Sequence, residues 1–295
     1  QARKKRIHPQ LDDKVLTDWN GLMISAFAKA AQALNSQSYL DRARKAADFC
    51  LTELRQKNGR LYKRWRQGKA GLPAHLEDYA FLIQGLLDLY EASLDPVYLV
   101  KSKELTDLTR TLFEDLEKGG FFLTAHDGEK LLTRPKEIYD GAIPSGNSIM
   151  ALNLARLWKI TGNKAYEDCL NSCFSAFSGF LESNPSGAEN FLHALAFVLQ
   201  PPAEIVVAGN LDDKTTASMI EAVHQKFLPF KTLLHLSPEF ESSKLVELAP
   251  YSIAFAHTEK PTFYLCRDQA CEQPKTELND IMEVLDNLIK PPQNK

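Results

Sequence analysis

The feature that most constrains the fold of this 295-residue chain is an internal repeat. Three apolar stretches with helical spacing begin at Asn20, Tyr79 and Asn147, and each start is followed nineteen residues later by a tyrosine. A polar turn precedes each of these tyrosines, so every unit predicts a helix, a turn and a second helix. Because hairpins of this kind bury their inner faces only against neighbours, the repeat predicts a stacked array of helical hairpins.

The two helices predicted for the first hairpin have different surfaces. Residues 22–34 are apolar and alanine-rich nearly all round, which is typical of a helix buried on several sides. Residues 40–54 carry apolar side chains on one side and charged side chains on the other. We therefore expect the first to be an inner helix and the second to be an outer helix with one solvated face.

The length of the repeat indicates how much of a closed ring is present. Repeat starts lie 59 residues (79 − 20) and 68 residues (147 − 79) apart, so six hairpins need about 360 residues. The helical pattern ends near residue 200. We expect a mainly α fold in which residues 1–200 form a partial (α/α) toroid of about three and a half hairpins.

A partial toroid leaves the first inner helix uncovered on one side. The expected consequence is an apolar surface along residues 22–34 that recruits another body. The chain opens on Gln1, without an initiator Met and inside a charged segment, which suggests an excerpt of a longer protein. The expected partner is therefore the missing N-terminal segment of the same protein or a separate protein that covers the first hairpin.

The sequence changes character after Pro201 and Pro202, which end the helical pattern. Residues 201–295 are predicted to form a small α/β unit, with residues 239–250 as a loop that can hold a short helix. We expect this unit to support the array, packing on it through Val206, Val207 and Leu265. Its predicted strands are residues 204–208, 232–236 and 262–266, and its predicted helices are residues 214–227 and 276–289.

Composition narrows the class of protein. With 44% hydrophobic residues, 25% charged residues and a net charge of −3, the chain is typical of a soluble globular protein, and nucleic acid is not an expected partner. No apolar stretch approaches the roughly 18 residues of a membrane span, and no signal peptide opens the chain. We expect a cytoplasmic protein without a membrane partner.

Five cysteines are an odd number for a disulfide framework. Cys50, Cys169 and Cys173 lie among packing residues of predicted helices and are expected to be buried thiols. Cys266 and Cys271 flank four residues after a predicted strand. They can form a structural or reducible pair, remain two free thiols or act in thiol chemistry, but no second cysteine pair completes a zinc site.

The residues best suited to chemistry cluster where the inner helices begin. The repeat register predicts that these clusters meet at one rim of the array. Two longer connections, residues 59–69 and 119–132, are expected to form β-hairpins that wall a pocket there. The candidate ligand-binding residues are Trp19, Asn20, His75, Tyr79, Trp65, Ser145 and Asn147.

Four carboxylic acids at the rim are the candidate catalytic residues: Asp78, Asp140, Glu77 and Asp18. Glycoside cleavage needs paired carboxylates, one as acid and the other as base or nucleophile. Aromatic rings beside them would stack on a sugar. The same acids are also typical caps of helix N-termini, and this second interpretation stays open.

Other chemistries have less support from the sequence. His75, Glu77 and Asp78 could supply metal ligands, but a hydrogen-bonded helix cap is the favoured interpretation, so no metal is expected. The chain has no Gly-rich nucleotide loop, and Ser145 lacks the flanking glycines of a hydrolase elbow, so no cofactor is expected. His193 lies in an apolar run and is expected to be a core histidine.

Four separated motifs, in order along the chain, resemble the spermatogenesis-associated, thioredoxin-domain-containing protein family. They are residues 11–23, 75–80, 136–148 and 264–274. The resemblance implies a helical domain similar to six-hairpin glycosidases and N-acylglucosamine 2-epimerases. In that family a thioredoxin-like domain with a Cys-His-x-x-Cys-His motif precedes it, and this sequence has neither.

Three functional hypotheses follow. The first is a carbohydrate-active or sugar-recognising domain, glycoside hydrolase-like or sugar epimerase-like, with rim carboxylates as acid and base. The epimerase variant needs two histidines facing one pocket, and only His75 is well placed. The second is a non-catalytic module that binds a ligand or a protein and is attached to a redox domain. The third is a thiol-based role for Cys266 and Cys271.

Overall fold

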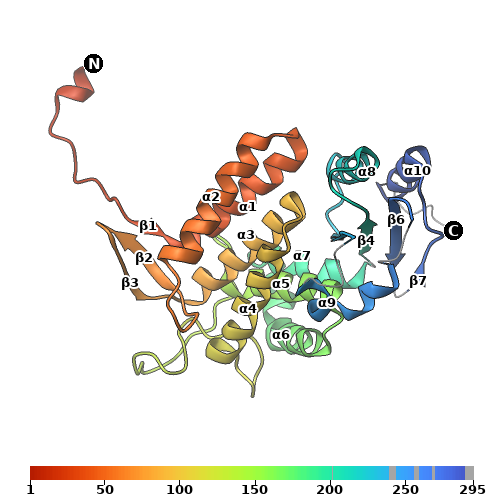
Figure 1. Ribbon diagram of the computed structural model, residues 1–295. Helices are drawn as coiled ribbons and strands as arrows, with labels where there is room; N and C mark the ends of the chain where they lie inside the picture. The colour runs from red at the N-terminus through yellow and green to blue at the C-terminus, as the bar shows by residue number, and fades with distance from the viewer. Residues whose placement is uncertain (201, 239–243, 256–258, 268–269, 290–295) are drawn as a thin grey trace.

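The computed structural model describes residues 1–200, 202–238, 244–255, 259–267 and 270–289 (Figure 1). Four inner helices and three outer helices alternate through the first part of the chain. The inner helices are α1 (Thr17–Leu34), α3 (Leu76–Ser93), α5 (Gly146–Thr161) and α7 (Glu189–Leu199). The outer helices are α2 (Gln37–Glu53), α4 (Pro96–Phe113) and α6 (Lys164–Ser183). The predicted partial α/α toroid is confirmed.

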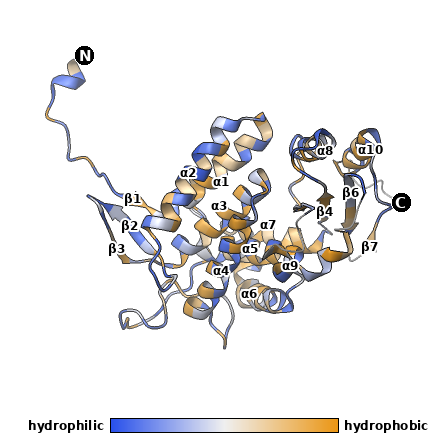
Figure 2. Cartoon of the chain, in the orientation of Figure 1, coloured by the Kyte–Doolittle hydropathy of each residue, from blue (hydrophilic) through white to orange (hydrophobic). Residues whose placement is uncertain are grey.

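The helix boundaries follow from capping residues. Asp95, Asn163 and Ser145 accept hydrogen bonds from backbone N–H groups in the first turns of α4, α6 and α5. α5 ends at Thr161, and the next residue, Gly162, has a φ of 68°, the left-handed conformation that glycine adopts readily. Figure 2 shows hydrophobic residues gathered where α3, α5 and α7 meet, with hydrophilic residues on the outer sides of α2 and α6.

The backbones of α1 and α3 touch at two glycines. A Cβ atom on Gly21 would lie 2.4 Å from the carbonyl carbon of Phe81, and one on Gly85 would lie 2.6 Å from the carbonyl oxygen of Gly21. Real Cβ atoms essentially never approach backbone atoms this closely, so only glycine fits at either position. The crossing brings the first turns of the two helices together.

We expect Gly21→Ala to lower the free energy of unfolding by about 1–3 kcal/mol, because the added methyl group pushes two rigid backbones apart. Gly179→Ala in α6 is the matched control, since nothing lies within 4 Å of its Cβ position. That change should stabilise the helix by up to about 1 kcal/mol. Urea denaturation of both variants measures the difference, and equal effects at the two positions would contradict the contact.

A three-stranded sheet lies beside the first hairpin. Its strands β1 (Val15–Leu16), β2 (Tyr62–Arg66) and β3 (Lys69–Pro73) pair antiparallel in that order. The hairpin expected in residues 59–69 is therefore present, extended to Pro73.

The second expected hairpin, residues 119–132, is wrong. This connection holds no strand; it is a series of turns. Its backbone pairs only through a single antiparallel bridge between Glu114 and Phe121, beside which Phe122 N donates to the Phe113 carbonyl at 2.9 Å. The Asn147 side chain completes the bonds of Phe121: its amide accepts from Phe121 N at 2.7 Å and donates to Phe121 O at 2.9 Å.

The α/β unit contains a four-stranded sheet with the order β5-β4-β6-β7. β4 pairs parallel with β5 and antiparallel with β6. The strands are β4 (Ala203–Ala208), β5 (Lys231–Leu236), β6 (Thr262–Arg267) and β7 (Ala270–Cys271), and the helices are α8 (Lys214–His224), α9 (Lys244–Leu248) and α10 (Leu278–Ile289). The predicted unit is confirmed, and α9 is the short helix in the predicted loop. Residues 239–243 of that loop lie outside the described residues.

This sheet is packed on both faces. Val206 joins the hydrophobic core of the helical array, whereas Val207 and Leu265 pack with α8 and α10. The expectation that all three face the array is wrong for Val207 and Leu265, because successive side chains of a strand point to opposite faces. Since one core joins the array and the sheet, the division into domains at residue 200 stays a prediction.

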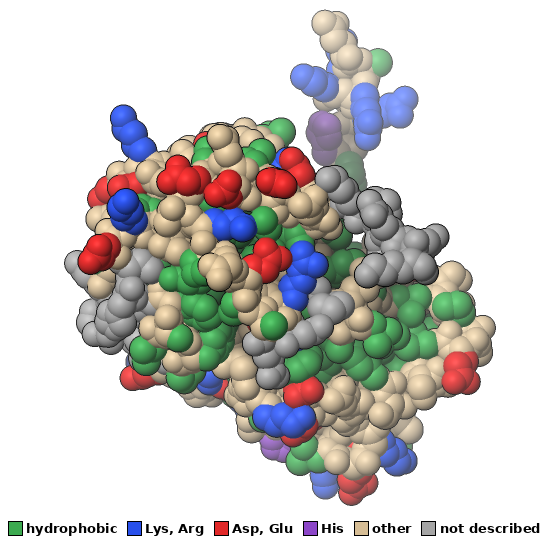
Figure 3. All heavy atoms as spheres, turned by 90° about the vertical axis from the view of Figure 1, so that its right-hand side faces the viewer, with side chains coloured by type: hydrophobic (Ala, Val, Ile, Leu, Met, Phe, Trp, Pro, Cys, Tyr) green, Lys and Arg blue, Asp and Glu red, His purple; other side chains and the backbone are tan. Residues whose placement is uncertain are grey.

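One side of α1 is uncovered, as expected for an open array. Trp19, Met23 and Leu34 are 60%, 49% and 65% exposed, whereas Ile24 and Ala28 are fully buried. The N-terminal segment before α1 includes the short helix η1 (Ala2–Lys5), and Figure 3 shows its Lys and Arg side chains standing clear of the body. Through the described part of the chain, every helix is too short or too polar to cross a bilayer.

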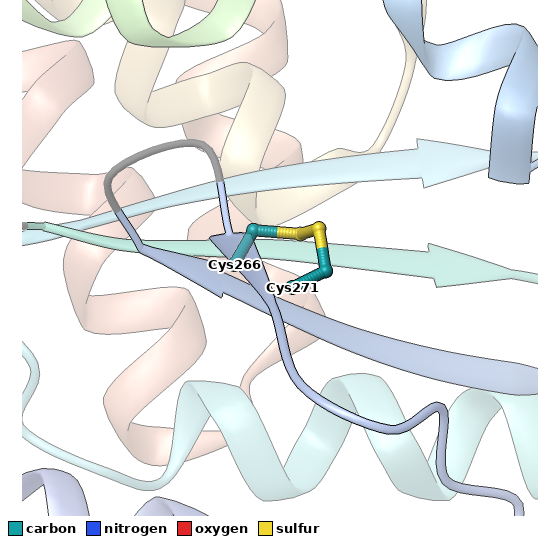
Figure 4. The surroundings of a disulfide bond; sticks show 2 residues. All are labelled: Cys266 and Cys271. Carbon is teal, nitrogen blue, oxygen red and sulfur yellow. A yellow bond between two sulfur atoms is a disulfide. The ribbon is translucent and has the colours of Figure 1, made fainter.

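Cys266 and Cys271 form a disulfide across the β6–β7 pair (Figure 4). The structure thus selects the paired state among the alternatives for these two residues. Cys50, Cys169 and Cys173 are free and buried, which confirms the prediction for them.

The disulfide closes a short loop with a sequence separation of 5. Replacing both cysteines with serine should therefore lower the free energy of unfolding by only about 2 kcal/mol. Thermal unfolding of the double variant and of the reduced wild type checks this, and both should lose the same amount. A double variant as stable as the oxidised wild type would contradict a structural role.

Candidate functional site

The predicted rim forms where the first turns of α1 and α3 meet. The Asp78 carboxylate accepts hydrogen bonds from the backbone N–H of His75 at 2.8 Å and of Asp18 at 3.2 Å. The Lys63 ammonium, from β2, lies 3.3 Å from Asp78 Oδ2 and 3.5 Å from Asp18 Oδ2. One lysine thus bridges two carboxylates at the start of two inner helices.

The small sheet places Lys63 there. β1 runs directly into α1, and the Thr17 hydroxyl at the start of α1 donates a hydrogen bond to the Tyr62 carbonyl at 2.6 Å. Because side chains alternate along a strand, Lys63 and Trp65 share one face of β2. The Trp65 ring meets Phe49 of α2 edge-on at 5.7 Å, so it packs between sheet and helix.

Burial dominates the electrostatics of the rim. Burial raises the pKa of Asp78 to about 7, although Lys63 opposes the shift. Burial also raises the pKa of Glu77 and lowers that of His75. Burial alone would lower the pKa of Lys63, but Asp78 and Asp18 outweigh it and raise the value. The rim therefore holds a lysine that stays positively charged. Beside it, the carboxyl groups of Asp78 and Glu77 keep their protons to a higher pH than usual.

The raised pKa of Asp78 makes stability depend on pH. Unfolding returns the carboxyl group to its ordinary pKa of 3.8, so the unfolded chain loses the proton first as pH rises. The contribution of Asp78 to the free energy of unfolding should therefore fall between pH 3.8 and about 7, and so should the difference in this free energy between the wild type and Asp78→Asn. Urea titrations of both proteins across this range measure the difference, and a difference that rises with pH would show that Asp78 is a charged cap.

Glu77 differs from the other rim acids. Its side chain is half-buried, and no hydrogen bond joins its carboxyl group to another residue in the described part of the chain. Asp18, by contrast, is buried, and its Oδ1 accepts from Trp19 N at 2.8 Å. The backbone N–H of Glu77 bonds its own carboxyl group. Glu77 is therefore the rim acid whose carboxyl group is bound by no other residue among those described.

Asp140 shares no contact with these groups among the described residues. Its carboxylate accepts hydrogen bonds from Ser145 N and Asn190 N, each at 2.8 Å. These donors lie at the starts of α5 and α7, so Asp140 joins two helix N-termini. The Ser145 hydroxyl accepts from Ser148 N at 3.1 Å, which is the capping interaction.

The aromatic candidates differ in accessibility. Tyr79 is only 2% exposed, its hydroxyl accepts from Leu61 N at 2.9 Å and its ring packs on Phe113. A stacking role on a sugar does not fit that position. Trp19 is exposed on the rim, and the neighbouring Asn20 amide donates to the Leu16 carbonyl at 2.7 Å.

Sequence reasoning missed Lys63 and a second polar centre. That centre surrounds Arg156 of α5 and lies deeper between the inner helices. Charged residues inside helices that are otherwise apolar all round were the available signal. His193 lines a cavity there and is half-buried, so the expectation of a core histidine is wrong. Over the residues that the structure describes, no three His, Cys, Asp or Glu side chains gather closely enough to hold a metal ion.

The fold and the rim define a helical domain of the α/α-toroid class. Among solved structures it is similar to a cellobiose 2-epimerase from Bacillus thermoamylovorans, with a TM-score of 0.48 and 16% identity over 58% of this chain and 46% of the other. It is also similar to a GH76 alpha-mannanase from Bacteroides thetaiotaomicron, with a TM-score of 0.45 and 18% identity over 66% and 61%.

The homologues of the chain are spermatogenesis-associated protein 20 sequences. It is 35% identical to the human protein over 97% of this chain and 38% of the relative, and 34% identical to the mouse protein over 97% and 37%. An uncharacterised protein of Caenorhabditis elegans is 32% identical over 96% and 39%. The chain therefore spans about two fifths of the length of these relatives, and the resemblance shown by the motifs is confirmed. No protein-family model matches the sequence.

Proposed function

We propose that the rim recognises a sugar and that the domain is carbohydrate-active, with Glu77 as the acid. The observation that supports this most is the state of Glu77: a half-buried carboxyl group whose pKa is raised by burial and which forms no hydrogen bond with another residue among those described. A carboxyl group with a raised pKa keeps its proton to a higher pH and can protonate a leaving oxygen. Asp18, beside Lys63, would be the second carboxylate, base or nucleophile, that glycoside cleavage requires.

The neighbouring residues would divide the remaining tasks. The exposed Trp19 ring offers a face on which a sugar can stack. Lys63 can donate to a sugar hydroxyl while it pairs with Asp18 and Asp78. Asp78 is fully buried, so it acts as a positioning residue that holds Lys63 and the starts of α1 and α3.

A second candidate function is a non-catalytic module that binds a ligand or a protein and is attached to a thioredoxin-like domain. The observation in its favour is that Asp18, Asp78 and Asp140 all accept hydrogen bonds from backbone N–H groups. That is the behaviour of helix caps. In this function the rim acids shape the surface and perform no proton transfer.

Calorimetric titration with a panel of mono- and disaccharides distinguishes the two functions. We expect the wild type to bind at least one sugar, and Glu77→Gln to abolish its turnover while it retains binding within about tenfold. Glu53→Gln, an exposed acid at the end of α2, is the matched control and should change neither property.

Asp78→Asn and Asp140→Asn extend the test, each at a stability cost of about 1 kcal/mol, the size of a lost cap. Loss of sugar binding in Asp140→Asn would support a role at the ligand for Asp140, whereas loss in Asp78→Asn would support the positioning of Lys63 by Asp78. A wild type that binds no sugar at all would remove the carbohydrate assignment and leave the binding module as the function.

Three further expectations belong to this proposal: a role in carbohydrate metabolism, a cytoplasmic location, and a partner or further segment over the open side of α1. The exposed Met23 and Leu34 support the last of these. Disulfides are rare in the cytoplasm, so thiol labelling of Cys266 and Cys271 in cell extracts tests the location.

A further inference from the structure

A cavity of about 450 Å³ lies between the inner helices and the α/β unit. Its walls come from α1, α3, α5 and α7 and from the segment that joins α8 to β5. The lining belongs to the middle and C-terminal parts of α1 and α3, as the positions of Lys29 and Asp88 show, whereas the rim is at their first turns. The cavity is therefore separate from the rim.

The deepest part of the cavity is a buried charge network. Arg156 of α5 donates to Asp88 at 2.7 Å and to Glu91 at 3.0 Å, and Lys231 of β5 donates to Glu91. All four side chains are at most 10% exposed. Two carboxylates are thus matched by two cations. Burial raises the pKa values of both carboxylates, but the cations outweigh burial and hold these values below their ordinary range, so both carboxylates are ionised.

Lys29 adds a positive charge that this network does not need. Its ammonium lies 3.3 Å from Asp88 Oδ2, which already accepts from Ser25, and its side chain is 60% exposed. Lys226 also borders the cavity, but its ammonium pairs with Asp286 of α10. The lining therefore carries one excess cation, at Lys29.

Uncommitted hydrogen-bonding groups lie around Lys29. The Gln32 and Gln84 amides line the cavity, and neither has a hydrogen-bond partner within the described part of the chain. Two histidines also face the cavity. Burial lowers the pKa of His193, and it lowers that of His224 to about 4, so both rings are neutral near pH 7. Each ring donates one N–H to a backbone carbonyl, His224 to Glu91 and His193 to Pro229, and its other nitrogen can accept from a hydroxyl group.

Apart from Gln225, the rest of the wall is apolar, and Leu152 and Phe197 contribute to it. A concave site of roughly 300–1,000 Å³ with apolar walls and a few convergent polar groups is the usual form of a small-molecule site. A cationic ligand does not suit it, because Asp88 and Glu91 are already paired.

We infer that this cavity binds a small organic anion that carries hydroxyl groups, with its carboxylate or phosphate group at Lys29. The hydroxyl groups of this anion form hydrogen bonds with the Gln32 and Gln84 amides and with the His193 ring. This site does not depend on sugar recognition at the rim, because it shares no residue with it.

Isothermal titration with gluconate, glucose 6-phosphate, inorganic phosphate and neutral glucose tests the inference. We expect gluconate or glucose 6-phosphate to bind the wild type, and glucose to bind at least tenfold more weakly than that anion. Binding of gluconate would indicate a carboxylate ligand, and binding of glucose 6-phosphate would indicate a phosphate ligand. Phosphate binding alone would mean an adventitious ion only and would overturn the site.

Three variants locate the binding. Lys29→Gln should weaken it about tenfold or more, the loss expected for one charge-assisted hydrogen bond. Lys226→Gln removes the same charge from a lysine that points to α10, and it should leave affinity within about twofold. Glu77→Gln at the rim should also leave it unchanged.

Thermal unfolding checks that the Lys29→Gln variant is folded. We expect it to be folded because the Lys29 side chain is largely exposed. Equal losses in Lys29→Gln and Lys226→Gln would mean that net charge alone attracts the anion. That result, or a wild type that binds neither hydroxylated anion, would overturn the inference. Loss of anion binding in Glu77→Gln would move the site to the rim.

Discussion

The direct backbone contact between α1 and α3 is the constraint on which the rest of the structure depends. Gly21 and Gly85 let the two helices approach until no side chain separates them. Only at this separation does the N–H of Asp18 reach the carboxylate of Asp78, so α3 caps the first turn of α1. β1 leads directly into that turn, and its pairing with β2 places the small sheet and Lys63 beside it.

The charge network around Arg156 has the corresponding role at the other end of the inner helices. One set of bonds connects α1, α3, α5 and β5 through Ser25, Asp88, Glu91, Arg156 and Lys231. Removing one member of such a buried set leaves an uncompensated charge, which typically costs about 3–5 kcal/mol. The network therefore aligns the helices with each other and fixes the α/β unit on the array.

Much of the fold could be predicted from the sequence, because periodicity is a local signal that fixes element type. The sequence predicted the inner helices, the change from helices to an α/β pattern near Pro201, and the short helix α9. The site was less accessible. The place of Lys63 depends on how a hairpin lies over two helices, and the bonds of Asp140 join segments 50 residues apart in sequence. Neither contact leaves a pattern in the neighbouring sequence. In addition, Asp and Glu serve both as helix caps and as catalytic acids, so residue type alone does not separate the two roles.

The open side of α1 has a consequence for the cavity behind it. Ala33 is exposed on that helix and also lines the cavity, so a segment or protein that covered α1 would become part of the wall around a bound molecule. If contact with that wall changed the affinity for the molecule, the molecule would change the affinity for the covering body by the same factor. Occupancy of the cavity would then report whether α1 is covered.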